Sequence, residues 1–496
     1  MPIKIDHKLT AQKLVPKINR LFELSAQKIL SIEKMWKPAN GTPVFTVKGQ
    51  YTSRGWTEWT QGFQFGAAIL QFDATGEKDF LEIGRRKTVE LMASHVSHIG
   101  VHDHGFNNVS TYGNLLRLMR EGKIAWNERE KDFYELALKV SGAVQAARWT
   151  RIADGTGFIH SFNGAHSLFV DTIRSCRALA LAHQLGHVLM GEQDKRISLL
   201  QRMIEHALNT ARYSIYYGEG RDAYDVRGRT THEAVFNVAN GIFRCPNSQQ
   251  GYSPFSTWTR GLAWALCGFP EELEFLETIN LDAIEDATAG EWARRCRELF
   301  GNGGKRRLPS FAKTVLSLGK QPARDAFATF LKAATATADF YIDNSCADGV
   351  PMWDTGAPHL HRLGDYPGKR SNPYNAWEPV DSSAAAIAAQ GLVRLGNYLL
   401  AKGDRKNGAR YRQAGLTVAN TIFAEPYLST NPRHQGLILH SVYHRPNGWD
   451  YIAPGQKVPN GESSMWGDYH ARELALLLLR EAKNEPYLTF FLNSKE

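Results

Sequence analysis

Two aspartates mark the places in this sequence where acid–base chemistry could occur. Asp103 lies in the run HDHGF (102–106), and Asp171 begins the run DTIRSCRAL. Two carboxyl groups can serve as general acid and general base when burial and a neighbouring negative charge raise the pKa of one of them. A carboxylate at a helix start can also accept hydrogen bonds from the first amides as an N-cap. Both roles are open for each aspartate at this point.

Aromatic and polar residues also precede apolar segments elsewhere. The run WTR (258–260) precedes LAWALCGF, Asp381 precedes SSAAAIAAQGLVRLG, and Ser463 and Ser464 precede the segment that ends LALLLLR. Such residues indicate helix starts, and we expect these Asp and Ser residues to be caps. Because buried helices that begin with Trp, Asp and Arg need polar surroundings there, we expect their N-terminal ends to meet around one cavity.

The helices that would position these residues alternate in character. Residues 11–35 carry apolar residues three and four positions apart, which is typical of an amphipathic helix. Apolar segments that begin near residues 63, 107 and 171 are predicted to be inner helices, and mixed segments at 80–100, 129–149 and 194–213 outer helices. This alternation predicts an all-α barrel of helical hairpins.

The chain carries no linker or low-complexity tract, so we predict a single domain over residues 1–496. A charged segment and a Gly/Lys/Arg turn interrupt the helical repeat, and we predict an insertion at about 270–321. The segments 231–250 and 351–379 are aromatic and rich in Gly, Asn and Pro, which indicates functional loops or short strands.

Composition narrows the class of protein. The formal net charge of +9 permits acidic ligands, but the basic residues are spread out and no nucleic-acid-binding motif accompanies them. Five cysteines without CxxC spacing indicate free thiols in a reducing compartment. We find no signal peptide and no run of about 18 apolar residues. We therefore expect a soluble, cytoplasmic protein without a nucleic-acid or membrane partner.

No motif for a metal ion or a cofactor stands out. His102 and His104 are close in sequence, but neither they nor the other histidine pairs belong to an HExxH motif or a cysteine cluster. GxGxxG, Walker and GxSxG motifs are also missing from the sequence. We predict no metal and no cofactor.

Seven runs, taken together and in order, resemble the unsaturated glucuronyl hydrolases of glycoside hydrolase family 88. They are WTQGF (59–63), HDHGF (102–106), DTIRSCRAL (171–179), QGYSPFSTWTRGLAWALCGF (250–269), DGVPMWD (348–354), DSSAAAIAA (381–389) and SSMWGDYHARELALLLL (463–479). The resemblance implies an (α/α)6 barrel. It also implies a hydrolase that removes 4,5-unsaturated uronic acid from the non-reducing end of lyase-generated oligosaccharides, by protonating C4 and adding water at C5.

The resemblance assigns roles to particular residues. Asp171 matches the catalytic acid/base, whose pKa we expect burial and Asp103, the second carboxylate, to raise. The expected substrate-binding residues are the ring-stacking tryptophans, a His–Gln pair eighteen positions apart, an arginine for the uronate carboxylate, and a further histidine. They are Trp59, Trp258 and Trp264; His232 and Gln250; Arg260; and His102. Residues 107–112 predict a more polar site wall than usual.

Three alternatives stay open. The unsaturated rhamnogalacturonyl hydrolases of family 105 share the barrel and the chemistry. A sugar epimerase or isomerase on the same barrel would exchange protons through His232 and His102. A non-catalytic glycan-binding barrel would need the tryptophans and not the carboxylates. The leaving sugar and the oligomeric state are left open.

Overall fold

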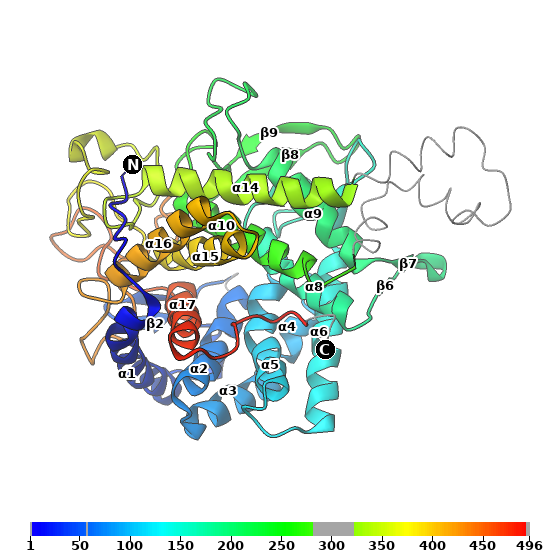
Figure 1. Ribbon diagram of the computed structural model, residues 1–496, viewed down its shortest axis with the longest axis horizontal. Helices are drawn as coiled ribbons and strands as arrows, with labels where there is room; N and C mark the ends of the chain where they lie inside the picture. The colour runs from blue at the N-terminus through cyan, green and yellow to red at the C-terminus, as the bar shows by residue number, and fades with distance from the viewer. Residues whose placement is uncertain (1, 56–57, 281–321, 493–496) are drawn as a thin grey trace.

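Helices arranged in a double ring form most of the structure (Figure 1). The computed structural model describes residues 2–55, 58–280 and 322–492. Within these ranges the inner helices are α2 (Gln61–Thr75), η3 with α5 (Gly105–Gly113, Asn114–Arg120), α7 with α8 (Thr172–Ser175, Arg177–Gln184), α10 (Thr259–Leu276), α15 (Ser382–Ala401) and α17 (Met465–Lys483). The outer helices are α1 (Ala11–Met35), α3 (Lys78–Leu91), α6 (Glu128–Ala147), α9 (Leu199–Tyr213), α14 (Pro322–Asn344) and α16 (Arg405–Ile422).

The inner ring is closed. Each inner helix contacts the next one, and α17 returns to α2, while each outer helix packs on an inner one. The predicted all-α (α/α)6 barrel is confirmed. Burial explains the two layers: α15 is buried along almost its whole length, whereas α9 buries one face. Glycine lets inner helices approach closely, because a Cβ on Gly105 would lie 2.2 Å from the carbonyl oxygen of Ser175.

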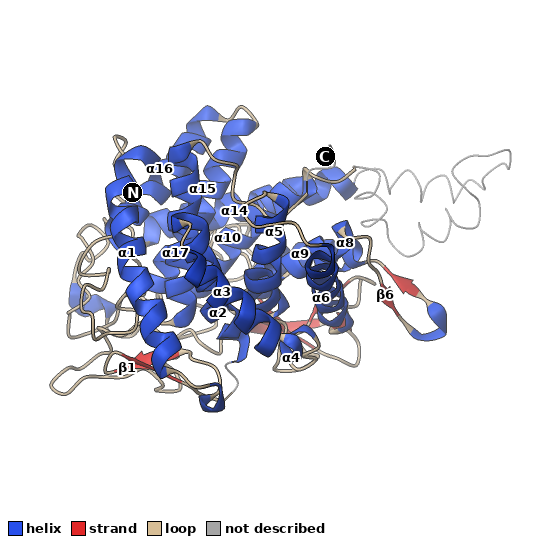
Figure 2. Ribbon diagram, turned by 90° about the horizontal axis from the view of Figure 1, so that it is seen from below, coloured by secondary structure: helices blue, strands red, loops and turns tan. Residues whose placement is uncertain are grey.

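Short strands gather toward one end of the ring (Figure 2). Strand β5 (Ser167–Phe169) pairs with β8 (Glu233–Phe236), and β8 with β9 (Phe243–Asn247), all antiparallel. The remaining strands form hairpins: β1 (Phe45–Val47) with β2 (Gln50–Thr52), β3 (Trp149–Arg151) with β4 (Gly157–Ile159), and β6 (Leu189–Met190) with β7 (Arg196–Ile197). The other short helices are α4 (Ala93–Val96), η1 (Pro38–Asn40), η2 (Glu58–Thr60), η4 (Glu192–Asp194) and η5 (Leu360–Leu363).

Two predicted boundaries differ from the structure. The outer helix predicted from residue 194 begins at Leu199, because 189–197 form the β6–β7 hairpin. Pro270 does not end α10, which continues to Leu276, so the start of the predicted insertion belongs to an inner helix. Residues 281–321 lie outside the described residues.

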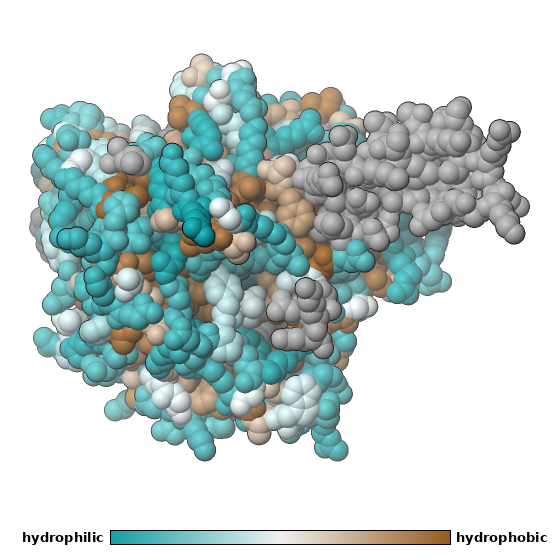
Figure 3. Space-filling view, viewed as in Figure 1, coloured by the Kyte–Doolittle hydropathy of each residue, from teal (hydrophilic) through white to brown (hydrophobic). Residues whose placement is uncertain are grey.

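The face seen in Figure 1 carries the C-terminal segment 484–492 and is largely hydrophilic (Figure 3). Among the helices described here, none is both long and apolar enough to cross a membrane. Most of the buried apolar side chains of the described residues form one contiguous core.

Candidate active site

A pocket of about 820 Å³ opens where the inner helices begin. Its lining combines large aromatic side chains with polar and charged groups. The lining residues are Gly55, Glu58, Trp59, His98, Gly100, Val101, His102, Asp103, Phe106, Phe162, Phe169, Asp171, Gln249, Gln250, Trp258, Arg260, Trp264, Tyr443, His444, Asn447 and Trp449. Eight of the nine predicted site residues are therefore in the lining, and the ninth, His232, lies directly behind it.

The two aspartates meet at His102. Asp103 precedes η3, and Asp171 follows β5 at the start of α7. The Nε2 atom of His102 lies 3.2 Å from Oδ1 of Asp171 and 3.7 Å from Oδ1 of Asp103. Both carboxyl groups are buried, with 8% and 7% of Asp171 and Asp103 exposed. Asp171 makes no capping hydrogen bond to the helix start, and its carboxylate contacts His102 instead.

The pKa shifts separate the two carboxyls, but not in the predicted direction. Burial raises the pKa of Asp103 to about 6, and the charge of Asp171 acts in the same sense. Burial also acts to raise the pKa of Asp171, but the hydrogen bond and charge of His102, with Arg260, outweigh it and lower that pKa. The expectation of a raised pKa for Asp171 is wrong, because it overlooked the imidazole between the two acids.

His232 lies just before strand β8 and Gln250 shortly after its partner strand β9, and a hydrogen bond joins the two residues. The backbone amides of Gln249 and Gln250 donate to Nδ1 of His232, at 3.0 and 3.3 Å. This makes Nδ1 an acceptor and leaves the proton on Nε2. That atom is buried and has no hydrogen-bond partner among the described residues. The ring packs 4.3 Å from Phe169 and 4.6 Å from Trp258, two aromatic residues of the pocket lining.

Arg260 is engaged by the protein itself. Its guanidinium donates to the carbonyl oxygens of Val442 and Tyr443 and to Oε1 of Gln250, the last at 2.6 Å. It lies between the rings of Trp258 and Trp466, 4.6 Å from each centroid. Only 1% of the residue is exposed. Arg260 thus positions Gln250 and the 442–443 loop, besides supplying charge.

The three predicted tryptophans line different parts of the pocket. Trp59 stacks on Trp466 at 5.1 Å, and Trp264 packs against Phe106 at 4.8 Å. Trp258 immediately precedes α10. Flat apolar faces such as these suit the rings of sugars.

The predicted caps are confirmed in part. Asp381 accepts hydrogen bonds from the amides of Ser383 and Ala384, and Ser464 accepts one from Gly467. Ser463 instead donates to Asp468 at 2.7 Å.

Sequence reasoning missed one pocket wall and misplaced another. Tyr443, His444, Asn447 and Trp449 line the pocket from the loop between α16 and α17. Their signal was the length of that aromatic, Gly- and Pro-containing segment. Residues 107–112 do not line the pocket, because they lie within η3 and bond to neighbouring helices; Asn107, for example, accepts from the amide of Gly62.

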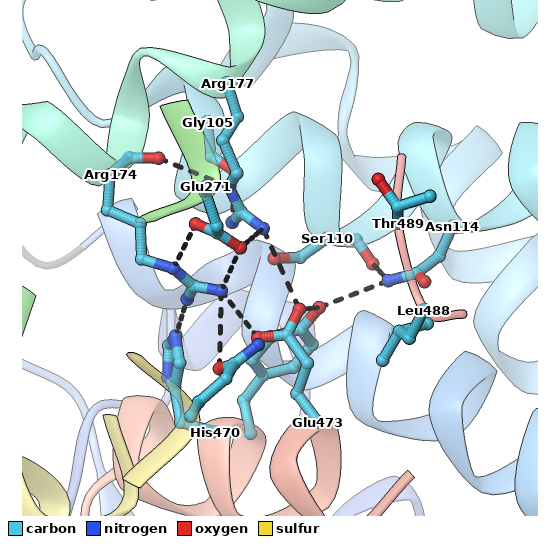
Figure 4. A network of polar contacts seen from close by, with 12 residues as sticks. Gly105, Ser110, Asn114, Arg174, Arg177, Glu271, His470, Glu473, Leu488 and Thr489 are labelled. Carbon is cyan, nitrogen blue, oxygen red and sulfur yellow. Dashed lines mark hydrogen bonds and ion pairs between the residues drawn. The ribbon is translucent and has the colours of Figure 1, made fainter. Parts of the chain in front are cut away.

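A charged network is centred on Arg174, which lies three positions after Asp171 in the sequence (Figure 4). Arg174 of α7 donates to Glu271 of α10 at 2.9 Å and to Glu473 of α17 at 2.7 Å. It also bonds to His470, whose ring packs edge-on to Trp264 at 4.9 Å. The network therefore joins three inner helices, α7, α10 and α17. Within the described ranges, no group of three or more His, Cys, Asp or Glu side chains is placed to hold a metal ion.

A buried carboxyl pair in an aromatic pocket, at the mouth of an (α/α)6 barrel, defines a toroidal enzyme of the glycosidase type. The sequence profile of Glycosyl Hydrolase Family 88 matches residues 38–286, half of the chain. The chain belongs to this family, as the sequence runs predicted. The epimerase and the non-catalytic barrel are thereby set aside.

Curated relatives agree with this assignment. The chain is 25% identical over 438 residues to an unsaturated glucuronyl hydrolase of Bacillus sp. (strain GL1), covering 86% of this chain and 87% of that protein. It is 22% identical over 420 residues to an unsaturated glucuronyl hydrolase of Formosa agariphila, covering 84% and 78%.

Solved structures share the fold. An unsaturated glucuronyl hydrolase specific for heparin superposes with a TM-score of 0.65 at 17% identity, covering 96% of this chain and all of that one. The enzyme of Bacillus sp. GL1 gives a TM-score of 0.63 at 20% identity, covering 94% and 96%.

Proposed function

We propose that this glycosidase removes 4,5-unsaturated uronic acid from the non-reducing end of oligosaccharides by hydrating the C4=C5 vinyl ether. The observation that carries the proposal is the buried pair Asp103 and Asp171, joined by His102 in an aromatic pocket. Family membership supports it, as do the names of the curated relatives.

In this proposal Asp171 delivers a proton to C4, and the positive charge that develops at C5 is shared with the ring oxygen. Water then adds at C5, and Asp171 accepts a proton from it. The resulting hemiketal opens and releases the leaving sugar. Asp103 holds negative charge close to the reacting carbons, while Trp59, Trp258 and Trp264 contact the ring.

The substrate-binding donors follow from unused hydrogen-bonding capacity. The Nε2–H group of His232 has no partner among the described residues, so we assign it to the uronyl group together with the side chain of Gln250. We further propose one catalytic domain over residues 1–496 and a cytoplasmic location. The buried free thiols Cys176, Cys267 and Cys346 support the location.

The test is the ultraviolet absorbance of the double bond. We expect it to fall when the protein meets unsaturated disaccharides, with no metal or nucleotide added. The panel includes chondroitin, heparin, hyaluronan, gellan, ulvan and pectin fragments. The last of these also tests the family 105 alternative. Saturated disaccharides with the same leaving sugars are the control, and absence of decay with every unsaturated fragment would refute the proposal.

Relatives show why the panel must be broad. One solved relative is described as specific for heparin, and another, from Streptococcus agalactiae, was solved with dGlcA-GalNAc6S. A curated relative from Streptococcus pyogenes, 21% identical over 338 residues, is an unsaturated chondroitin disaccharide hydrolase. The leaving sugar of the present enzyme is to be read from the fastest substrate.

A further inference from the structure

One nitrogen of His102 faces both catalytic carboxyls. Nε2 is 3.2 Å from Asp171 and 3.7 Å from Asp103, and only 2% of the residue is exposed. The ring is stacked over Phe162 at 6.2 Å and lies edge-on to Phe169 at 5.6 Å. Because Phe162 and Phe169 pack against the imidazole ring, they favour the orientation in which Nε2 lies beside Asp171 and Asp103.

The backbone of His102 is held separately from the pocket. Its carbonyl oxygen accepts hydrogen bonds from Oγ of Ser175 at 2.7 Å and from Nε2 of Gln145 at 2.8 Å. Nδ1, on the other side of the ring, is buried and has no partner among the described residues. A histidine whose sole task was to bind substrate would not need its Nε2 between two carboxyls. The geometry favours a task in handling protons.

We infer that His102 is a positioning residue that stores the catalytic proton and passes it to Asp171, within the reaction proposed above. The Nε2–H bond breaks as an O–H bond forms on Asp171. That O–H bond then breaks as the C4–H bond forms, and the C4=C5 electron pair supplies the new bond. Water then attacks C5 and gives one of its protons to the Asp171 carboxylate. Asp171 passes this second proton on to Nε2, which restores the starting state of His102. The net change is addition of one water molecule to the substrate.

The charges around the ring agree with a stored proton. Burial acts to lower the pKa of His102, but Asp103 and Asp171 outweigh it and raise that pKa. Arg148, at the end of α6, opposes them as a permanent cation. Burial lowers the pKa of four nearby imidazoles to between about 3 and about 4, so these four are neutral at neutral pH. These are His104, His160, His206 and His232.

The first experiment compares the wild type with His102→Gln, which keeps an N–H donor but does not titrate. We expect kcat at neutral pH to fall on the order of 10²-fold. The alkaline limb of the kcat/KM profile should move to lower pH, because the proton would then be held by the carboxyls alone. An unchanged alkaline limb with a raised KM would overturn the inference and leave His102 as a binding residue.

A matched control is His206→Gln. His206 is a fully buried histidine of α9 that accepts a hydrogen bond from the amide of Ile159 and lies outside the pocket lining. Its loss is expected to lower the melting temperature without moving the alkaline limb. If both variants move that limb equally, the shift reflects general loosening and the inference fails.

A measurement on folded protein keeps the inference testable if His102→Gln does not fold. The ¹⁵N resonances of His102 should titrate at lower pH in Asp171→Asn than in the wild type, because one of the two carboxylates that retain the proton is gone. Equal titration in both proteins would overturn the inference. This readout needs no substrate, so it is separate from the proposed function, which fails if the wild type leaves every unsaturated disaccharide intact.

Discussion

At the residue scale, Asp103 and Asp171 are buried to nearly the same extent, but their neighbours shift the pKa values of the two carboxyl groups in opposite directions. Nε2 of His102 lies 3.2 Å from Oδ1 of Asp171 but 3.7 Å from Oδ1 of Asp103. The shorter distance favours the ionised form of Asp171. Because both carboxyl groups lie within 3.7 Å of the same imidazole nitrogen, the charge of each of these groups affects the pKa of the other two.

Asp171→Asn is expected to reduce kcat about 10³-fold with little change in substrate binding, since general acid–base groups contribute roughly 10²- to 10⁴-fold. Asp103→Asn should also be severe. The double variant should be little worse than the worse single variant, because groups that act as a unit are non-additive. Single-turnover rates and binding isotherms of all three variants provide the measurement. A double variant equal to the product of the singles would show that the carboxyls act independently.

Arg260→Ala is expected to lower stability by roughly 2–4 kcal/mol, because it leaves the carbonyls of Val442 and Tyr443 and the carboxylate of Asp381 buried without their partner. KM should rise as Gln250 loses its support. Melting curves recorded beside the kinetics separate the two effects. Arg212→Ala, which breaks an exposed pair with Asp154, is the control and should change neither. A raised KM at unchanged stability would instead make Arg260 a direct ligand of the uronate.

At the scale of elements, the site depends on how closely η3 and α7 approach. A Cβ on Gly105 would lie 2.2 Å from the carbonyl oxygen of Ser175, so Gly105→Ala must push apart the two segments that carry Asp103 and Asp171. We expect Gly105→Ala to lower the free energy of unfolding by roughly 1–3 kcal/mol. We also expect kcat to fall, and by a larger fraction than the free energy of unfolding.

Gly113→Ala, at the other end of η3, is the matched control for Gly105→Ala. There the tightest contact of the new Cβ is a methyl group of Val109 at 3.0 Å, which can yield, and the next is the ring of Phe490 at 3.5 Å. Thermal unfolding and kinetics of the two variants are compared side by side. Equal kcat for Gly105→Ala and the wild type would contradict the dependence of the site on this helix approach.

The helices and most of the site could be predicted because both leave local signals. Apolar periodicity and Asp or Ser caps mark the starts of α15 and α17, and the run at 258–260 marks α10. The direction of the pKa shift at Asp171 could not be predicted, since it depends on an imidazole sixty-nine positions earlier in the chain. The wall formed by Tyr443 and Trp449 likewise comes from a loop whose path is set by tertiary contacts.

At the scale of the whole molecule, an ion cluster at the ends of α2, α5 and α17 helps to close the ring. Asp73 accepts hydrogen bonds from Arg117 and Arg480, both at 2.7 Å. Burial acts to raise the pKa of Asp73, but these two guanidinium groups outweigh it and hold that pKa well below its ordinary value. A lowered pKa in the folded state means that the stabilisation is present above the ordinary aspartate pKa and is lost as the pH falls through the folded value.

Asp73→Asn should therefore destabilise the protein by roughly 1.5–3 kcal/mol at neutral pH, since the buried guanidinium groups of Arg117 and Arg480 lose one of their two carboxylate partners and keep only Glu121. The deficit should shrink as the pH falls below about 4. Denaturant titrations at neutral and acidic pH provide the measurement. Glu33→Gln, which breaks a partly exposed pair with Arg86, is the control, with less than about 1 kcal/mol expected. A deficit that is equal at both pH values would contradict this account of the ring closure.

The most direct test of the central claim follows the reaction of the wild-type enzyme by ¹H NMR in D₂O with the best unsaturated disaccharide of the panel. Hydration of the vinyl ether requires that the vinyl H4 resonance disappear at least as fast as the leaving sugar is released, with deuterium delivered to C4. Ordinary cleavage at the anomeric carbon would release the leaving sugar before the vinyl resonance is lost, because the double bond stays in the free uronic acid until its ring opens and the enol at C5 becomes a ketone. The first result is the one that the site around Asp171, Asp103 and His102 predicts, and the second would contradict it.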